Sequence, residues 1–109
     1  MTTREEALAA ALELPGAYED TPFHDPNWVV VRRGNRRIFL CTFEREGKIW
    51  LNVKCAPDWS SVLISSFDSV VPAYHMNKRH WVSIILDGRM EEREIVRLIE
   101  ESYDLTGKK

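Results

Sequence analysis

Apolar and polar residues alternate along residues 48–55, and this alternation is the clearest signal of regular structure in the chain. Every second residue from Ile49 onward is apolar, whereas Trp50, Asn52 and Lys54 occupy positions between them. Successive side chains of a β-strand point to opposite faces of its sheet. The pattern therefore predicts a strand that buries the face carrying Ile49 and presents the other three side chains on the opposite face.

Three more apolar stretches, at residues 28–33, 38–43 and 81–86, have the length and the content of Val, Ile and Phe that are typical of strands. The segments that follow the first two stretches, residues 33–36 and 44–47, contain Gly or Asn, which tolerate the positive φ of tight turns. We therefore predict two hairpins that join three consecutive strands.

Proline marks two less regular segments. Residues 70–76 are expected to form a loop or a short edge strand, because Pro72 has no N–H to donate to a neighbouring strand. Residues 17–27 contain two prolines and are expected to form an extended loop, which Phe23 would pin to the core.

Helical spacing of apolar residues predicts three helices. The first begins with a capping box formed by Thr3 and Glu6 and ends near Leu14. The second opens at residues 56–58 with a proline in its first turn, and the third covers residues 91–105 with acidic residues in its first turns. The buried faces are expected to comprise Ala7, Leu8, Ala11 and Leu12 in the first helix, Trp59, Val62 and Leu63 in the second, and Ile95, Leu98, Ile99 and Ser102 or Tyr103 in the third.

The order of these elements, α-β-β-β-α-β-β-α, predicts an α+β fold. Tight turns between consecutive strands give antiparallel pairing, so we expect an antiparallel sheet of four to five strands with three helices. Helices would cover one face of the sheet in a two-layer arrangement, and the other face would remain at least partly exposed to water.

The composition is that of a globular protein. The chain has 109 residues, which predicts a single domain over residues 1–109, and its apolar fraction of 44% is enough for a core of its own. No apolar run is long enough to span a membrane, and no apolar leader follows the N-terminus. Because Cys41 and Cys55 also lie inside predicted strands, we expect a cytoplasmic protein with reduced core thiols.

The net charge of −2 is distributed unevenly. Residues 1–27 carry one base and six acids (net −5), residues 28–83 carry nine bases and four acids (net +5), and residues 84–109 carry five bases and seven acids (net −2). A basic middle segment between acidic ends suggests an anionic partner that meets the sheet. Alternatively, the terminal helices simply carry Glu on their solvated faces.

The polar face of the predicted sheet offers candidate chemistry through two indoles, an amide, a hydroxyl and an ammonium, from Trp50, Trp81, Asn52, Ser83 and Lys54. Indoles can stack on bases, and an ammonium can hold a phosphate. The two basic turns, residues 32–37 and 77–80, would add cations at the rim of this face. Alternatively, half-exposed Trp residues cover a solvated sheet face or mark a protein interface.

Catalytic and metal sites are not indicated. The three histidines and two cysteines have no C-x-x-C or H-x-x-x-H spacing, and no G-x-S-x-G, P-loop or G-x-G-x-x-G motif occurs. Most acids lie on the predicted solvated faces of helices. We therefore expect neither an enzyme nor a cofactor or metal, and we expect His75 and His80 to hydrogen-bond the turn between them.

The segment Pro-Ala-Tyr-His-Met-Asn-Lys at residues 72–78, followed by His-Trp at 80–81, resembles the MmcQ/YjbR family of small bacterial proteins. Matches in the same order extend the resemblance over nearly the whole chain, at Leu14-Pro15-Gly16, Pro22-Phe23, Asn52-Val53-Lys54 and Ser102-Tyr103-x-Leu105. One departure is His24, where many members have Gly. The resemblance implies a double-wing, YjbR-like fold, whose members are commonly labelled DNA-binding by fold analogy.

Two functions are therefore expected. The first is a DNA-binding module that uses the basic sheet face and the two basic turns. The second is a protein-interaction or homodimerisation module on the same face, with no nucleic-acid role. We expect no membrane role for either module. The residues expected to contact nucleic acid are Arg32, Arg33, Arg36, Arg37, Trp50, Asn52, Lys54, Lys78, Arg79, His80 and Trp81.

Overall fold

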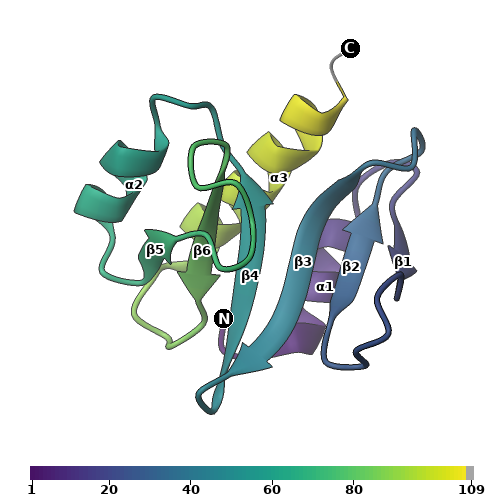
Figure 1. The fold of residues 1–109 in the computed structure, drawn as a ribbon, viewed down its shortest axis with the longest axis horizontal. Coiled ribbons are helices and arrows are strands. Elements are labelled where there is room, and N and C mark those ends of the chain that lie inside the picture. Colours follow the sequence, from purple (N-terminus) through teal and green to yellow (C-terminus); the bar gives the residue numbers. More distant parts are fainter. Residues whose placement is uncertain (108–109) are drawn as a thin grey trace.

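The computed structural model describes residues 1–107, which form one six-stranded antiparallel sheet and three helices (Figure 1). The spatial order of the strands is β1-β2-β3-β4-β6-β5. The elements are α1 (Arg4–Leu12), β1 (Tyr18–Asp20), β2 (Val29–Arg32), β3 (Ile38–Arg45), β4 (Lys48–Lys54), α2 (Ser60–Ser66), β5 (Val70–Pro72), β6 (Trp81–Ile85) and α3 (Glu92–Thr106).

The predicted α+β class is confirmed, with more strands than the four to five expected. The additional strand is β1, which lies inside the segment predicted to be a loop. It has three residues, two of them exposed, and therefore shows no apolar alternation. Pro72 ends β5 at the other edge of the sheet, where its missing N–H removes no ladder hydrogen bond.

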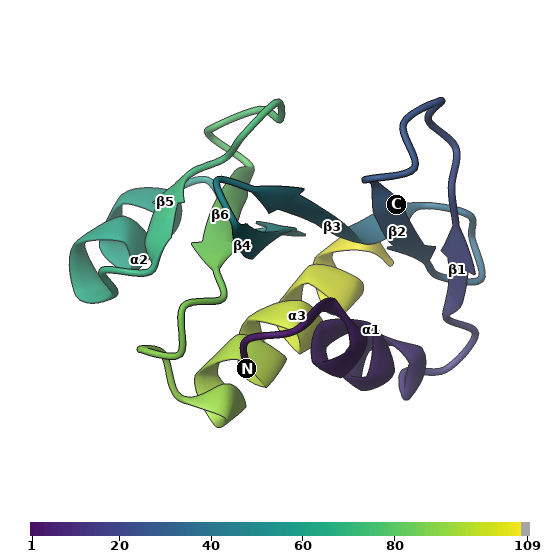
Figure 2. The same ribbon diagram turned by 90° about the horizontal axis from the view of Figure 1, so that it is seen from below.

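Helices α1 and α3 pack side by side on one face of the sheet (Figure 2). The predicted capping box starts α1: the Glu6 N–H donates to Thr3 Oγ1 at 3.2 Å, and the Thr3 N–H donates to Glu6 Oε1 at 3.1 Å. Ala7 and Ala11 are fully buried, because small side chains let α1 approach the sheet closely. The buried stripe of α3 is also as predicted, with Ile95, Leu98, Ile99 and Ser102.

Three apolar predictions were wrong. Leu12, which was expected on the buried face of α1, is 38% exposed. Helix α2 begins at Ser60 and lies beyond β5 at one end of the molecule, so it buries only Leu63 (Figure 1). Trp59 and Val62, which were expected on its inner face, are 54% and 44% exposed. Phe23 does not pin its loop to the core either, since it is 48% exposed and packs edge-on against Trp28.

Within residues 1–107, no helix combines the length and the apolar character needed to cross a membrane.

A half-buried carboxylate clamps the end of β6 to the start of β5. Asp87 accepts hydrogen bonds from the Ser69 hydroxyl at 2.7 Å and from Arg89 Nε at 2.8 Å, and its side chain is 11% exposed. Burial alone would raise the pKa of Asp87, but the hydrogen bonds from the Arg89 side chain, Ser69 and the Arg89 N–H lower that pKa to about 2. The ionised carboxylate therefore stabilises the fold.

We predict that Asp87→Asn lowers the free energy of unfolding at neutral pH by about 1–2 kcal/mol. Because the folded-state pKa is depressed from 3.8, this contribution is complete above that pH and is lost as the pH falls towards about 2. Denaturant titrations at neutral and acidic pH should show a shallower acid loss in the variant. Asp58→Asn is the control, because Asp58 is exposed and forms no ion pair with Arg89; equal acid losses in the Asp87 variant and the wild type would contradict the assignment.

Candidate ligand-binding groove

The open face of the sheet, defined as the face opposite α1 and α3, is flanked by two raised loops (Figure 2). One loop, residues 21–28, connects β1 to β2, and the other, residues 73–80, connects β5 to β6. Trp50 and Asn52 lie on this face but are only 8% and 0% exposed. The prediction that they form a solvated surface is wrong, because the side chains and loops above the sheet cover them.

A buried polar network holds the 73–80 loop onto the sheet. The Asn52 side-chain amide donates to the Tyr74 carbonyl at 2.8 Å, and the Tyr74 N–H donates to Ser83 Oγ at 2.9 Å. The Ser83 hydroxyl in turn donates to Asn52 Oδ1. Asn52 and Ser83 are register partners in β4 and β6, so both ends of the Tyr74 backbone are tied to neighbouring strands. This is why polar residues occupy the centre of the sheet.

Stacked aromatic rings fill the space between the two loops. The Trp28 indole stacks on Phe43 with ring centroids 4.2 Å apart and planes at 15°, and Phe43 stacks on Tyr74 at 5.5 Å. Tyr74 also contacts the His75 ring at 4.0 Å, and the Arg45 guanidinium lies 4.5 Å from the Tyr74 ring centroid. These contacts connect the 21–28 loop, β3 and the 73–80 loop into one layer.

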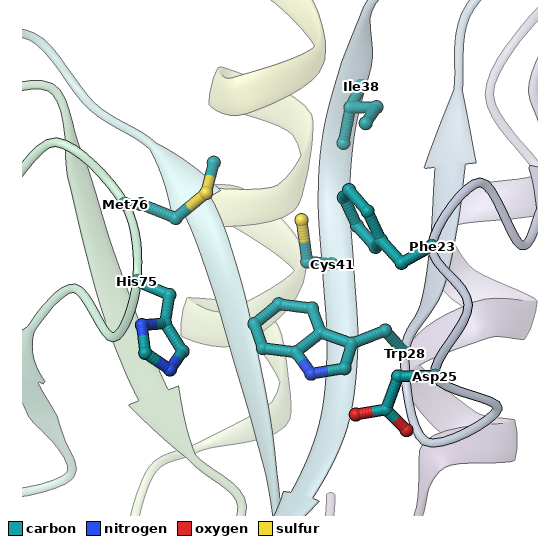
Figure 3. Close-up of a pocket in the computed structure, with 7 residues that line it drawn as sticks. All are labelled: Phe23, Asp25, Trp28, Ile38, Cys41, His75 and Met76. Carbon is teal, nitrogen blue, oxygen red and sulfur yellow. The ribbon is translucent and has the colours of Figure 1, made fainter.

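A groove of about 280 Å³ remains open above this layer (Figure 3). Its lining consists of side chains from the two loops and from β3: Phe23, Asp25, Trp28, Ile38, Cys41, His75 and Met76. Phe23, Asp25 and Trp28 come from one side, and His75 and Met76 from the other (Figure 3). His75 adopts a φ of 59°, which turns the loop sharply at the rim of the groove.

The groove offers no activated nucleophile. Burial raises the pKa of the Cys41 thiol to about 12, although the nearby Arg32 charge opposes the shift, so the sulfur stays protonated at neutral pH. The described residues also contain no group of three His, Cys, Asp or Glu side chains placed to hold a metal ion.

Three arginines of the predicted basic surface make structural contacts instead. Arg32 forms an ion pair with Asp20 at 2.7 Å. The Arg33 guanidinium lies 3.9 Å from the Tyr103 ring centroid and donates to the Tyr103 carbonyl. Arg37 donates to the Thr106 carbonyl at 3.4 Å.

Helix α3 explains why these arginines are engaged. It has no basic residue in its last turn, and the last carbonyls of an α-helix have no i+4 backbone N–H partner within the helix. The β2–β3 hairpin supplies both the positive charge and the donors, including Asn35 Nδ2, which donates to the Thr106 carbonyl at 2.9 Å. Part of the basic middle segment therefore caps a helix.

The other cations gather at one end of the sheet, which we call the basic end. The β2–β3 hairpin, the last residue of β4 and the first residue of β6 meet there, because Lys54 pairs with Trp81 in the ladder. The basic end carries four side chains that have no hydrogen-bond or ion-pair partner among residues 1–107: Arg36, Lys54, Lys78 and Arg79. Ile38 and Met76, which line the groove, lie within two residues of Arg36 and Lys78 respectively.

The 77–80 turn is held by Asn77 and not by the imidazoles. Asn77 Oδ1 accepts the Arg79 N–H at 2.9 Å, and the Asn77 carbonyl accepts the N–H groups of His80 and Trp81. His80 and Trp81 are both half-buried. The expectation that His75 and His80 hydrogen-bond this turn through their side chains is not met among the described residues.

Sequence reasoning missed the residues that form the groove. Phe23 and Met76 belong to matched segments of the family resemblance, which was the available signal for the groove. Trp28 stands at the start of a predicted strand. The sequence there does not show whether its indole is buried in the core or lines a groove. Asp25 lies in a loop whose position depends entirely on the fold.

The chain is thus a small α+β protein that carries two loops over the open face of an antiparallel sheet. The sequence matches the YjbR family over residues 12–105, and the chain belongs to that family. The resemblance noted in the sequence is thereby confirmed.

Relatives and solved structures match this chain over nearly its full length. YyaQ of Bacillus subtilis (strain 168) is 33% identical over 118 positions, covering 97% of this chain and 99% of the relative. YbdF of Escherichia coli O157:H7 is 35% identical, covering 93% and 81%. The crystal structure of Deinococcus radiodurans DR2400 matches with a TM-score of 0.90 at 30% identity, covering 100% of this chain and 81% of that one. A Pseudomonas syringae crystal structure matches with a TM-score of 0.84 at 26% identity, covering 95% and 98%.

We predict that Asn52→Ala lowers the free energy of unfolding by about 2–3 kcal/mol, because the Tyr74 carbonyl and the Ser83 hydroxyl lose their buried partner. Combining it with Ser83→Ala should cost less than the sum of the single changes, since both act through one network. Urea titrations measure these values. Ser66→Ala, which removes a hydroxyl bonded within α2, is the control; additive effects at Asn52 and Ser83 would contradict the network.

We also predict that Arg33→Ala lowers the free energy of unfolding by about 1 kcal/mol, because α3 loses a donor and a cation at its C-terminal end. Arg36→Ala, in the same β2–β3 hairpin, should change the free energy of unfolding by less than about 0.5 kcal/mol. Thermal unfolding followed by circular dichroism compares the two. If both variants lost the same free energy of unfolding, the distinction between the helix-capping Arg33 and Arg36 would be wrong.

Proposed function

We propose that this protein binds nucleic acid across the open face, with phosphates on the basic end and bases at the groove. The observation that carries the proposal is the placement of four unpaired cations at the sheet end into which an aromatic-lined groove leads. Lys and Arg hold phosphates, and exposed aromatic rings stack on bases. This combination favours a polyanion with planar groups over other partners.

The proposed contacts differ from those predicted from sequence. Trp50 and Asn52 support the loop from beneath, and Arg32, Arg33 and Arg37 make structural contacts. Contacts to phosphate would come from Arg36, Lys54, Lys78 and Arg79, with Phe23 and Trp28 providing ring surfaces. His80 and Trp81 lie at the same end but are half-buried, so their share of the contact area is small.

A footprint of four cations sets the expected strength. Each neutralised phosphate contributes a slope of about −0.7 to −0.9 to the dependence of log affinity on log salt concentration. Four contacts give a slope of about −3, which corresponds to modest affinity that weakens strongly as salt rises. Because the net charge of the chain is −2, nonspecific attraction by the rest of the surface adds little.

A protein-interaction face built on the predicted indoles has less support. Trp50 is buried and Trp81 is half-buried, so this face offers little apolar surface to a second protein. A sedimentation measurement beside the nucleic-acid titration reports self-association independently.

We predict that fluorescence anisotropy with a labelled oligonucleotide of about 20 nucleotides gives a salt slope of about −3, and that Arg36→Ala combined with Lys78→Ala makes it shallower by about 1.5. The matched control is Lys48→Ala, an exposed lysine at the opposite end of β4. Absence of binding at about 20 mM salt, or an equal effect of the control, would contradict the proposal.

A further inference from the structure

We infer that the groove holds one unpaired base, so that the preferred partner is single-stranded nucleic acid; this inference rests on the proposed function. It further assigns Asp25 as the group that selects bases by their amino donors. The first part follows from the ring geometry and the second from the polarity of the groove.

Trp28 presents one ring face to the groove. Its other face is covered by Phe43, which stacks on it at 4.2 Å and is 1% exposed. In Figure 3 the indole lies broadside in the groove, between His75 and Asp25. A planar group that enters the groove therefore meets a flat ring whose orientation is already set by the core, which lowers the entropy cost of stacking.

The size and walls of the groove suit a single base. Phe23 stands edge-on to Trp28, with planes at 86° and centroids 6.0 Å apart, and Met76 and His75 lie across from it. A volume of about 280 Å³ is at the lower limit of small-molecule sites, so it has room for one planar ring system. A base inside a duplex shows only its edge, and it would have to leave the stack to lie on Trp28.

The polar groups give the groove a direction. Asp25 lies at the end of the groove away from Ile38 (Figure 3), whereas Arg36 and Lys78 of the basic end lie within two residues of Ile38 and Met76 in the sequence. Asp25 Oδ1 accepts the Asn27 N–H at 2.9 Å, and Oδ2 has no hydrogen-bond partner among residues 1–107. A carboxylate repels phosphate and accepts hydrogen bonds only, so the backbone belongs at the basic end and an amino-bearing base edge at Asp25.

Cytosine and thymine make the sharpest comparison. They are pyrimidines of similar size, and cytosine carries an N4 amino donor where thymine carries the O4 acceptor. A carboxylate at the base edge accepts a hydrogen bond from the cytosine amino group and repels the thymine O4 oxygen. We therefore expect oligo-dC to bind about five- to tenfold more tightly than oligo-dT, and either strand to bind about tenfold more tightly than a duplex of equal length.

The experiment titrates the full chain with oligo-dC, oligo-dT and a mixed duplex of about 12 nucleotides, followed by anisotropy and by the four indole N–H resonances. Phe23→Ala should weaken single-strand binding about five- to tenfold and leave duplex binding unchanged. Trp59→Ala, which removes an exposed indole on the N-terminal side of α2, should change neither. Asp25→Asn should remove the preference for oligo-dC while retaining affinity for both strands.

The results separate this inference from the proposed function. Equal binding of strand and duplex, or equal effects of Phe23→Ala and Trp59→Ala, would overturn the single-base site while the nucleic-acid proposal stands. An unchanged dC preference in Asp25→Asn would overturn the role of that carboxylate. Failure of all three ligands at about 20 mM salt would overturn both, and thermal unfolding of each variant confirms that it is folded.

Discussion

The hydrogen bonds between Asn52, Ser83 and the Tyr74 backbone are the constraint on which the open face depends. They are buried, so a loop that shifted without admitting water would leave these groups with no hydrogen-bond partner, and that cost keeps the loop in place. The loop then covers Trp50 and carries His75 and Met76 to the rim of the groove. The aromatic layer and the groove are thus consequences of a polar pair at the centre of an otherwise apolar sheet.

The arginines at the basic end fall into two groups, those that contact helix α3 and those that do not. The C-terminal carbonyls of α3 need donors, and the β2–β3 hairpin provides them through Arg33, Asn35 and Arg37. This docking also joins the hairpin to the helix layer behind the sheet. The cations that remain outside this contact, among them Arg36 and Lys78, are those to which the proposed function assigns the phosphate contacts. A count of basic residues along the chain overstates the surface available to phosphate.

The sequence was a good guide to elements with strong periodicity and a poor guide to what covers them. The capping box at Thr3 and the buried stripe of α3 follow from local spacing, and the structure shows both. β1 was missed because a three-residue polar edge strand has no period of its own. Trp59 was assigned to a buried face because helical spacing does not reveal that α2 projects past the edge of the sheet.

Alternation along β4 by itself determined which side chains share a face, because a strand has only two faces. Whether the second face is solvated depended on a loop about 20 residues later in the chain, and only the tertiary structure decided that. The same holds for the groove, whose lining comes from two loops and one strand that are separated in sequence. Local spacing reports the direction of a side chain, whereas exposure and charge pairing depend on contacts between segments that are distant in the chain.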